Sequence, residues 1–164
     1  MPIWLIHSSI VRHWWVDGPS SVDCSRFLRE HLAKGVSQCI ASDLLPFLAL
    51  RDAAAYLHFP NLSEAISSAA LSDIVATLGR LERNRNFDYV SWQEPDVRAE
   101  AFKVATEYGI PLEDAVDVAI AEAYNVPLLV AHDDQLADLI RLSELRLSFR
   151  VEHIRNVVQR IFGS

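Results

Sequence analysis

The sequence predicts a three-layer α/β fold, in which a central, mostly parallel β-sheet carries helices on both faces. Short apolar runs typical of strands alternate with longer helical segments along the whole chain. The run Val126–Ala131 is apolar throughout, as expected of a strand buried on both faces of a parallel sheet. The chain has 164 residues, 51% hydrophobic and 23% charged, which suits one domain with a substantial core.

The N-terminal half is expected to hold two strands and three helices. The first strand is Ile3–Ile6, which ends in a polar triplet, and the second is Gln38–Ala41. Apolar residues at helical spacing predict a helix from Val22 to Ala33, which ends before a glycine. Two further helices are expected, one capped by Ser42 or Asp43 and running to about Leu57, the other opened by the capping box Asn61–Glu64 and ending near Glu82.

The C-terminal half continues the alternation. Prolines open two of its helices, and the second of these is apolar on most sides and therefore central. A last strand is expected before a short basic terminal helix. The expected elements are the strands Phe87–Trp92, Val126–Ala131 and Ser148–His153, and the helices Pro95–Gly109, Leu112–Tyr124 and one from Asp133 or Asp134 to Leu145.

Composition excludes several classes of protein. A formal charge of −7 argues against non-specific coating of nucleic acid, which depends on many basic contacts to phosphates. No apolar run approaches the roughly 20 residues of a membrane helix, and no signal peptide is recognisable, so a cytoplasmic protein is expected. Cys24 and Cys39 lack the spacing of a zinc site and are interpreted as buried free thiols.

The chemistry is expected at the carboxyl ends of the strands, where parallel α/β sheets form their functional crevice. Carboxylates reach this edge from segments distant in sequence, as in a site for a hard cation such as Mg²⁺. The residues placed there are His7, Ser8, Ser9, Ser42, Asp43, Asp114, His132, Asp133 and Asp134.

Three segments carry a family resemblance. The segment YGIPLEDAVDVAIAEAYNVPLLVAHDDQL, together with IWLIHSSIV and SDLLPFLALRDA upstream, resembles the ordered motifs of PIN domains of the VapC ribonuclease-toxin type. The resemblance implies a PIN-like three-layer domain over residues 1–154, followed by a short helical tail over 155–164. It also implies a metal-dependent nuclease acting on RNA, with several carboxylates around Mg²⁺ or Mn²⁺.

Carried over position by position, two of the four acidic positions of the family are retained. They fall on Asp114 and Asp133, which are the expected metal ligands and catalytic residues. The first acid falls on His7, with Ser9 matching the serine of that motif, and the second falls on Leu48. The threonine of the last motif is replaced by Ala131. His7, Leu48 and Ala131 are therefore family positions at which the original chemistry has been lost.

Several alternatives remain open for these residues. Asp117 shares a helical face with Asp114 and is a supporting, spare carboxylate, and Asp52 lies one turn beyond Leu48. His7 either binds a softer metal such as Zn²⁺ or pairs with Asp114 or Asp133 in place of an ion. The structural alternatives are a helix-dipole role for Asp114 and an N-cap role for Asp133.

Three functional hypotheses follow. We prefer a PIN-like protein with lost or weakened nuclease activity, a retained RNA- or protein-binding role, and weak or absent binding of Mg²⁺ or Mn²⁺. The second is an active endoribonuclease with an altered metal site, in which His7, Asp114 and Asp133 are the catalytic residues and Asp117 or Asp52 adds a carboxylate. The third is a regulatory domain with only fold-level similarity. The resemblance also implies a homodimer and an antitoxin-like partner, for which the large apolar candidates are Trp14, Trp15, Phe59 and Trp92.

Overall fold

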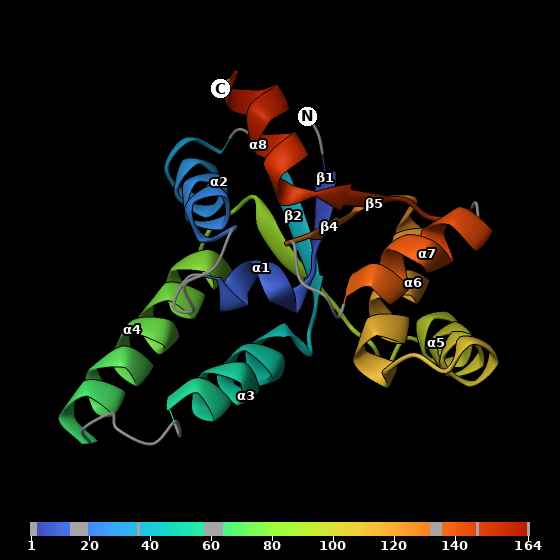
Figure 1. Cartoon of the computed structure of the whole chain (residues 1–164), viewed down its shortest axis with the longest axis horizontal. Helices are drawn as coiled ribbons and strands as arrows, with labels where there is room; N and C mark the ends of the chain where they lie inside the picture. Colours follow the sequence, from blue (N-terminus) through green and yellow to red (C-terminus); the bar gives the residue numbers. More distant parts are fainter. Residues whose placement is uncertain are drawn as a thin grey trace.

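The molecule is built on a five-stranded, fully parallel sheet (Figure 1). The computed structural model describes residues 3–13, 20–35, 37–57, 64–131, 136–146 and 148–163. Within these ranges the strand order is β3-β2-β1-β4-β5, and all neighbouring pairs are parallel. The strands are β1 (Ile3–Ile6), β2 (Gln38–Ser42), β3 (Phe87–Val90), β4 (Leu128–Val130) and β5 (Val151–His153). The predicted α/β, PIN-like fold class is confirmed.

Helices cover both faces of this sheet. The described helices are α1 (Ser8–Arg12), α2 (Ser21–Lys34), α3 (Leu45–Leu57), α4 (Glu64–Glu82), α5 (Pro95–Tyr108), α6 (Leu112–Tyr124), α7 (Ala137–Leu145) and α8 (Ile154–Phe162). Apolar side chains of α1, α2, α3, α4 and α8 form one core, and those of α5, α6 and α7 form the other. None of the helices in the described ranges is both long and apolar enough to cross a membrane.

The central strands supply both cores through the alternation of their side chains. In β1, Trp4 and Ile6 point into the first core, whereas Leu5 points into the second. In β4, Leu129 and Leu128 divide in the same way. All five side chains are at most 3% exposed, so the continuous apolar runs of the sequence reflect strands covered on both faces.

The boundaries of several elements differ from the sequence predictions for local reasons. The strand β3 ends at Val90, and not at Trp92, because the Trp92 N–H donates to Asp43 Oδ1 at 3.1 Å instead of continuing the ladder. The five-residue helix α1 was not predicted; it starts at Ser8 because His7 caps it through its side chain. The helix α6 has the predicted bounds, and Asn125 ends it in the left-handed conformation at φ 50°.

The two cysteines are buried and free, as the sequence predicted. Burial raises the pKa of the Cys24 thiol to about 12, with Asp23 adding to the effect. Burial alone raises the pKa of the Cys39 thiol even further. Both thiols therefore stay protonated and unreactive near neutral pH.

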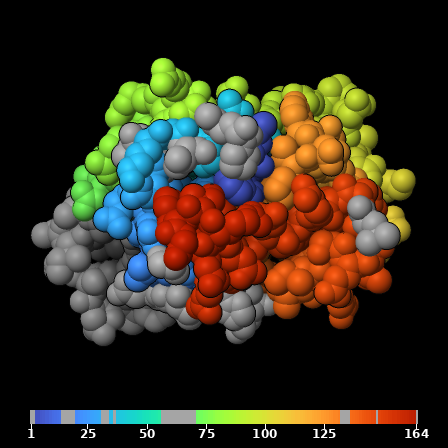
Figure 2. Space-filling view, turned by 90° about the horizontal axis from the view of Figure 1, so that it is seen from above, coloured from blue at the N-terminus to red at the C-terminus, as the bar shows by residue number. Residues whose placement is uncertain are grey.

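The terminal helix α8 packs against α2, and Figure 2 shows this C-terminal segment (red) lying beside the blue N-terminal region. Val157 and Val158 are at most 2% exposed and belong to the first core. At the rim, Arg26 lies over the Phe162 ring, 4.5 Å from its centroid. The separate tail over 155–164 stays a prediction, and a substitution in α8 can test it.

We expect Val157→Ala to lower the free energy of unfolding by about 2 kcal/mol, because it removes two buried methyl groups and leaves a void. In a chain of this size the corresponding fall in Tm is about 4–8 °C, measured by thermal melting. The exposed neighbour Asn156 provides the matched control, since Asn156→Ala should change stability by less than about 0.5 kcal/mol. Equal, small effects of both substitutions would show that α8 is a peripheral tail.

Candidate functional site

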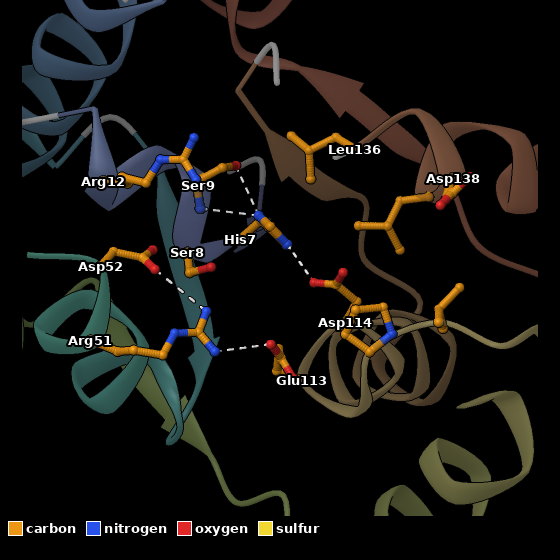
Figure 3. A pocket seen from close by; sticks show the side chains of 13 residues that line it. His7, Ser8, Ser9, Arg12, Arg51, Asp52, Glu113, Asp114, Leu136 and Asp138 are labelled. Carbon is orange, nitrogen blue, oxygen red and sulfur yellow. Dashed lines mark hydrogen bonds and ion pairs between the residues drawn. The ribbon is translucent and has the colours of Figure 1, made fainter. Parts of the chain in front are cut away.

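A pocket of about 290 Å³ opens at the carboxyl edge of the sheet, beside the end of β1 (Figure 3). Its walls come from α1, α3, the start of α6 and the start of α7. Parallel topology explains this convergence, because all strands end at the same edge and their following segments meet there. This volume lies at the lower limit of small-molecule sites. It leaves room for an ion with its waters or for a small polar group.

His7 is at the centre of a hydrogen-bonded chain in this pocket. Its ring is 6% exposed, and Nε2 lies 2.9 Å from Asp114 Oδ1. On the other side, the Ser9 N–H donates to Nδ1 at 3.0 Å, and Ser9 Oγ lies 2.8 Å from the same nitrogen. Figure 3 shows the imidazole pointing from the end of β1 directly toward the carboxylate on α6.

The contact with the Ser9 N–H assigns a tautomer to the imidazole. Because Nδ1 accepts the Ser9 N–H, that nitrogen must carry a lone pair and no proton. The remaining proton therefore lies on Nε2, from which it is donated to Asp114. In this tautomer Nε2 donates to Asp114, and a metal ion would bind this nitrogen only after displacing its proton. The pairing of His7 with Asp114 that the sequence offered as an alternative is present.

Asp114 and Asp117 occupy one face of α6. Both lie near His7, and one ligand atom from each of these three residues falls within 4.8 Å of the others, so the group could hold a metal ion. Asp117 is 5% exposed. Burial raises the pKa of the Asp117 carboxyl to about 7; His7 nearby lowers this pKa, while Asp114 and Glu113 raise it. Buried carboxyls with raised pKa values cluster at functional sites, as well as in structural ion-pair networks.

Arg51 on α3 neutralises the opposite wall of the pocket. Its Nη1 donates to Glu113 Oε1 at 3.1 Å, and its Nη2 donates to Asp52 Oδ1 at 3.4 Å. Asp52 lines the pocket, whereas Leu48, one turn earlier, is 6% exposed and does not. The helix α3 therefore brings a carboxylate to the site at Asp52 and not at the position of Leu48.

Ser9 and Ala131 are joined behind His7. The Ala131 N–H donates to Ser9 Oγ at 3.1 Å, which ties the end of β4 to the start of α1. Both residues are buried, Ser9 at 4% and Ala131 at 0% exposure. A backbone N–H thus connects the end of β4 to the segment that follows β1.

The structure brings together His7, Ser9, Asp114 and Asp117 of the predicted site residues. Asp133, with His132 and Asp134, lies outside the described residues, so the predicted approach of Asp133 to His7 stays a prediction. Sequence reasoning did not place four further charged side chains in the pocket: Arg12, Arg51, Glu113 and Asp138. Glu113 directly precedes Asp114 in the sequence, and Arg51 directly precedes Asp52. This proximity was the signal that could have placed them at the site.

Comparisons with known proteins support the fold. No protein-family model matches the chain, and no curated protein sequence is significantly similar. A chain of a toxin–antitoxin complex from Klebsiella pneumoniae is 14% identical, with 81% of this chain and 89% of that chain covered and a TM-score of 0.49. PAE2754 from Pyrobaculum aerophilum is also 14% identical, with 99% of this chain and 98% of that chain covered and a TM-score of 0.59. At this identity, the likeness to PAE2754 shows that the two chains share a fold over almost their entire lengths.

Proposed function

We propose that this chain is a PIN-like protein whose metal-dependent nuclease activity is lost or weakened and whose role is to bind RNA. The observation that carries the proposal is the His7 Nε2–H, which donates to Asp114 at the position where a cation would bind this carboxylate. A hydrogen bond there relieves the repulsion between neighbouring acids without an ion. Arg51 supports the proposal, because its guanidinium performs the same task for Asp52 and Glu113.

The pocket still has residues that suit a divalent cation. Four carboxylates line it against two arginines, so with a neutral His7 its net charge favours a cation. Asp114 and Asp117 would hold the ion, since Mg²⁺ commonly takes one or two protein carboxylates and keeps several waters. A bound ion would activate a water molecule and offset charge on an RNA phosphate. Binding is expected to be weak because Asp114 must first release the His7 N–H.

Two measurements on the full chain test this proposal. We expect calorimetric titration to show Mg²⁺ and Mn²⁺ binding only in the millimolar range or weaker. We also expect the chain to bind a mixed RNA pool and to show no metal-dependent cleavage of it. Asp114→Asn removes the carboxylate paired with His7, and any cleavage of RNA by the parent should be unchanged in this variant. Asp96→Asn, on the exposed first turn of α5, is the matched control for loss of one charge.

A second candidate, an active metal-dependent endoribonuclease, is favoured by the compact His7, Asp114 and Asp117 group. The near-neutral pKa of Asp117 suits a residue that exchanges protons during catalysis. Metal-dependent cleavage by the parent that disappears in Asp114→Asn and persists in Asp96→Asn would establish this candidate and overturn the first.

The homodimer, the antitoxin-like partner and the cytoplasmic location implied by the sequence stay predictions. Of the proposed apolar contact residues, Trp14, Trp15 and Phe59 lie outside the described residues. Trp92 is partly buried and packs against the second core, so its ring contributes to packing within the chain. Sedimentation equilibrium of the purified chain measures the oligomeric state directly.

A further inference from the structure

A second hollow of about 190 Å³ adjoins the pocket. It lies between the end of α5 and the outer side of α7, and is lined by Tyr108, Ile110, Asp138, Arg141, Leu142 and Leu145. Ile110 and Asp138 line both the hollow and the pocket, so the two spaces are neighbours along one surface. Drug-sized ligands take about 300–1,000 Å³, so the hollow suits a fragment of the size of a single flat ring system.

An RNA strand bound at this surface needs a source of affinity other than its phosphates. The chain carries a formal charge of −7, and the pocket is lined by more carboxylates than arginines. Binding through phosphates depends on many basic contacts and on the release of counterions. Contacts to the bases have no such requirement, because every base has an uncharged face that can stack.

The hollow has the chemistry that a base requires. Tyr108 supplies an aromatic ring, and Arg146 lies over that ring with Cζ 5.7 Å from its centroid, which holds it in place. Arg146 is itself fixed by Glu122 and Glu100 at 2.8–3.1 Å.

The rest of the hollow is lined by both apolar and charged side chains. Ile110, Leu142 and Leu145 give it apolar area. The exposed side chains Asp138 and Arg141, three residues apart on α7, offer an acceptor and a set of donors for the edge of a base.

We infer that this hollow binds one unpaired base of a single-stranded RNA. The strand must be single, because the faces of bases in a duplex are already stacked on one another. The inference rests on the proposed RNA-binding function and adds to it that recognition is carried by the base. Ile110 and Asp138, which line both spaces, place the base directly beside the pocket.

The test measures binding of a short 2′-O-methyl RNA, which resists cleavage, and of an abasic strand with the same number of phosphates. Fluorescence anisotropy in buffer with Mg²⁺ gives both dissociation constants. We expect the parent to bind the RNA about tenfold more tightly than the abasic strand, within the range of about 5- to 150-fold for one stacked base. The salt dependence should be shallow, with a slope of about −0.7 for a single phosphate contact.

Three variants assign the preference to the hollow. Tyr108→Leu keeps apolar bulk but removes the ring, and Arg141→Gln replaces the guanidinium and its fork of donors by a shorter amide. Each substitution should reduce the RNA-to-abasic ratio toward one. Tyr108→Phe keeps the ring and should retain the ratio. Arg80→Gln, exposed on the remote helix α4, is the matched control for loss of one positive charge. Because each variant is judged by a ratio, a general loss of stability does not imitate the expected result.

The outcomes separate this inference from the proposed function. If the parent binds neither strand, RNA binding itself fails. If the parent binds both strands equally, RNA binding holds and the base site is overturned. A preference that survives both Tyr108→Leu and Arg141→Gln also overturns it, because the base is then held elsewhere.

Discussion

Mg²⁺ is expected to raise the Tm of His7→Asp by about 5–10 °C at a concentration about 100 times its dissociation constant. The parent should shift by less than about 1 °C under the same conditions, because it binds the ion poorly. Aspartate is a favoured N-cap, so it replaces the imidazole as acceptor for the Ser9 N–H and α1 is retained. It cannot donate to Asp114, and a bound cation relieves the resulting repulsion between carboxylates without requiring one of them to take up a proton.

His7→Asn is the matched control for this substitution. It preserves the cap and also removes the imidazole, but it adds no negative charge. Its Tm should therefore respond to Mg²⁺ no more than that of the parent. Thermal melts over a series of Mg²⁺ concentrations compare the three proteins, and a strong response of the parent alone would show that His7 belongs to a working metal site.

Asp117→Asn is expected to become more stable than the parent as the pH rises from about 4 to above 7. The folded pKa of Asp117 is raised from 3.8 to about 7, so folding retains a proton that the unfolded chain releases. Stability contributed by such a group is fully present below the unfolded pKa and is lost as the pH rises through the folded pKa. With about 1.4 kcal/mol for each pH unit, the difference reaches at most about 4 kcal/mol.

Urea unfolding of parent and variant between pH 4 and 8 measures this difference. Asparagine has nearly the same shape as the carboxyl and no charge, so the two curves should be close near pH 4 and diverge toward pH 7. Asp138→Asn, at an exposed position of the same pocket, should follow the parent curve. Parallel curves for Asp117→Asn and the parent would show that Asp117 is ionised in the folded protein throughout this range.

The layer structure could be predicted from the sequence because its signals are local. The apolar run of β1 and the alanine-rich helix α6 have the predicted bounds, since burial on all sides leaves a continuous apolar pattern. The helix α1 was missed because it depends on a hydrogen bond from one side chain. His7 is an unusual N-cap, and no periodic pattern marks a helix of five residues.

The site was predictable only in part, for a related reason. Asp114 and His7 follow from motif order, because topology brings the ends of strands together. Arg51 was missed because its role depends on the direction of a long side chain, which turns from α3 toward Glu113 over 62 positions in sequence. Helical spacing identified Asp52 as a carboxylate one turn beyond Leu48. The spacing does not show which side-chain donors bind each carboxylate.

The hydrogen bonds around His7 have a consequence for how the pocket responds to its surroundings. In many metal sites the ligands are ordered by the ion, so their arrangement depends on the supply of that ion. Here the Ser9 N–H, the imidazole and the Asp114 carboxylate are ordered by hydrogen bonds to one another. All three groups belong to the polypeptide. The arrangement is therefore held by hydrogen bonds of the polypeptide itself, and the proposed function predicts that a chelator leaves it unchanged.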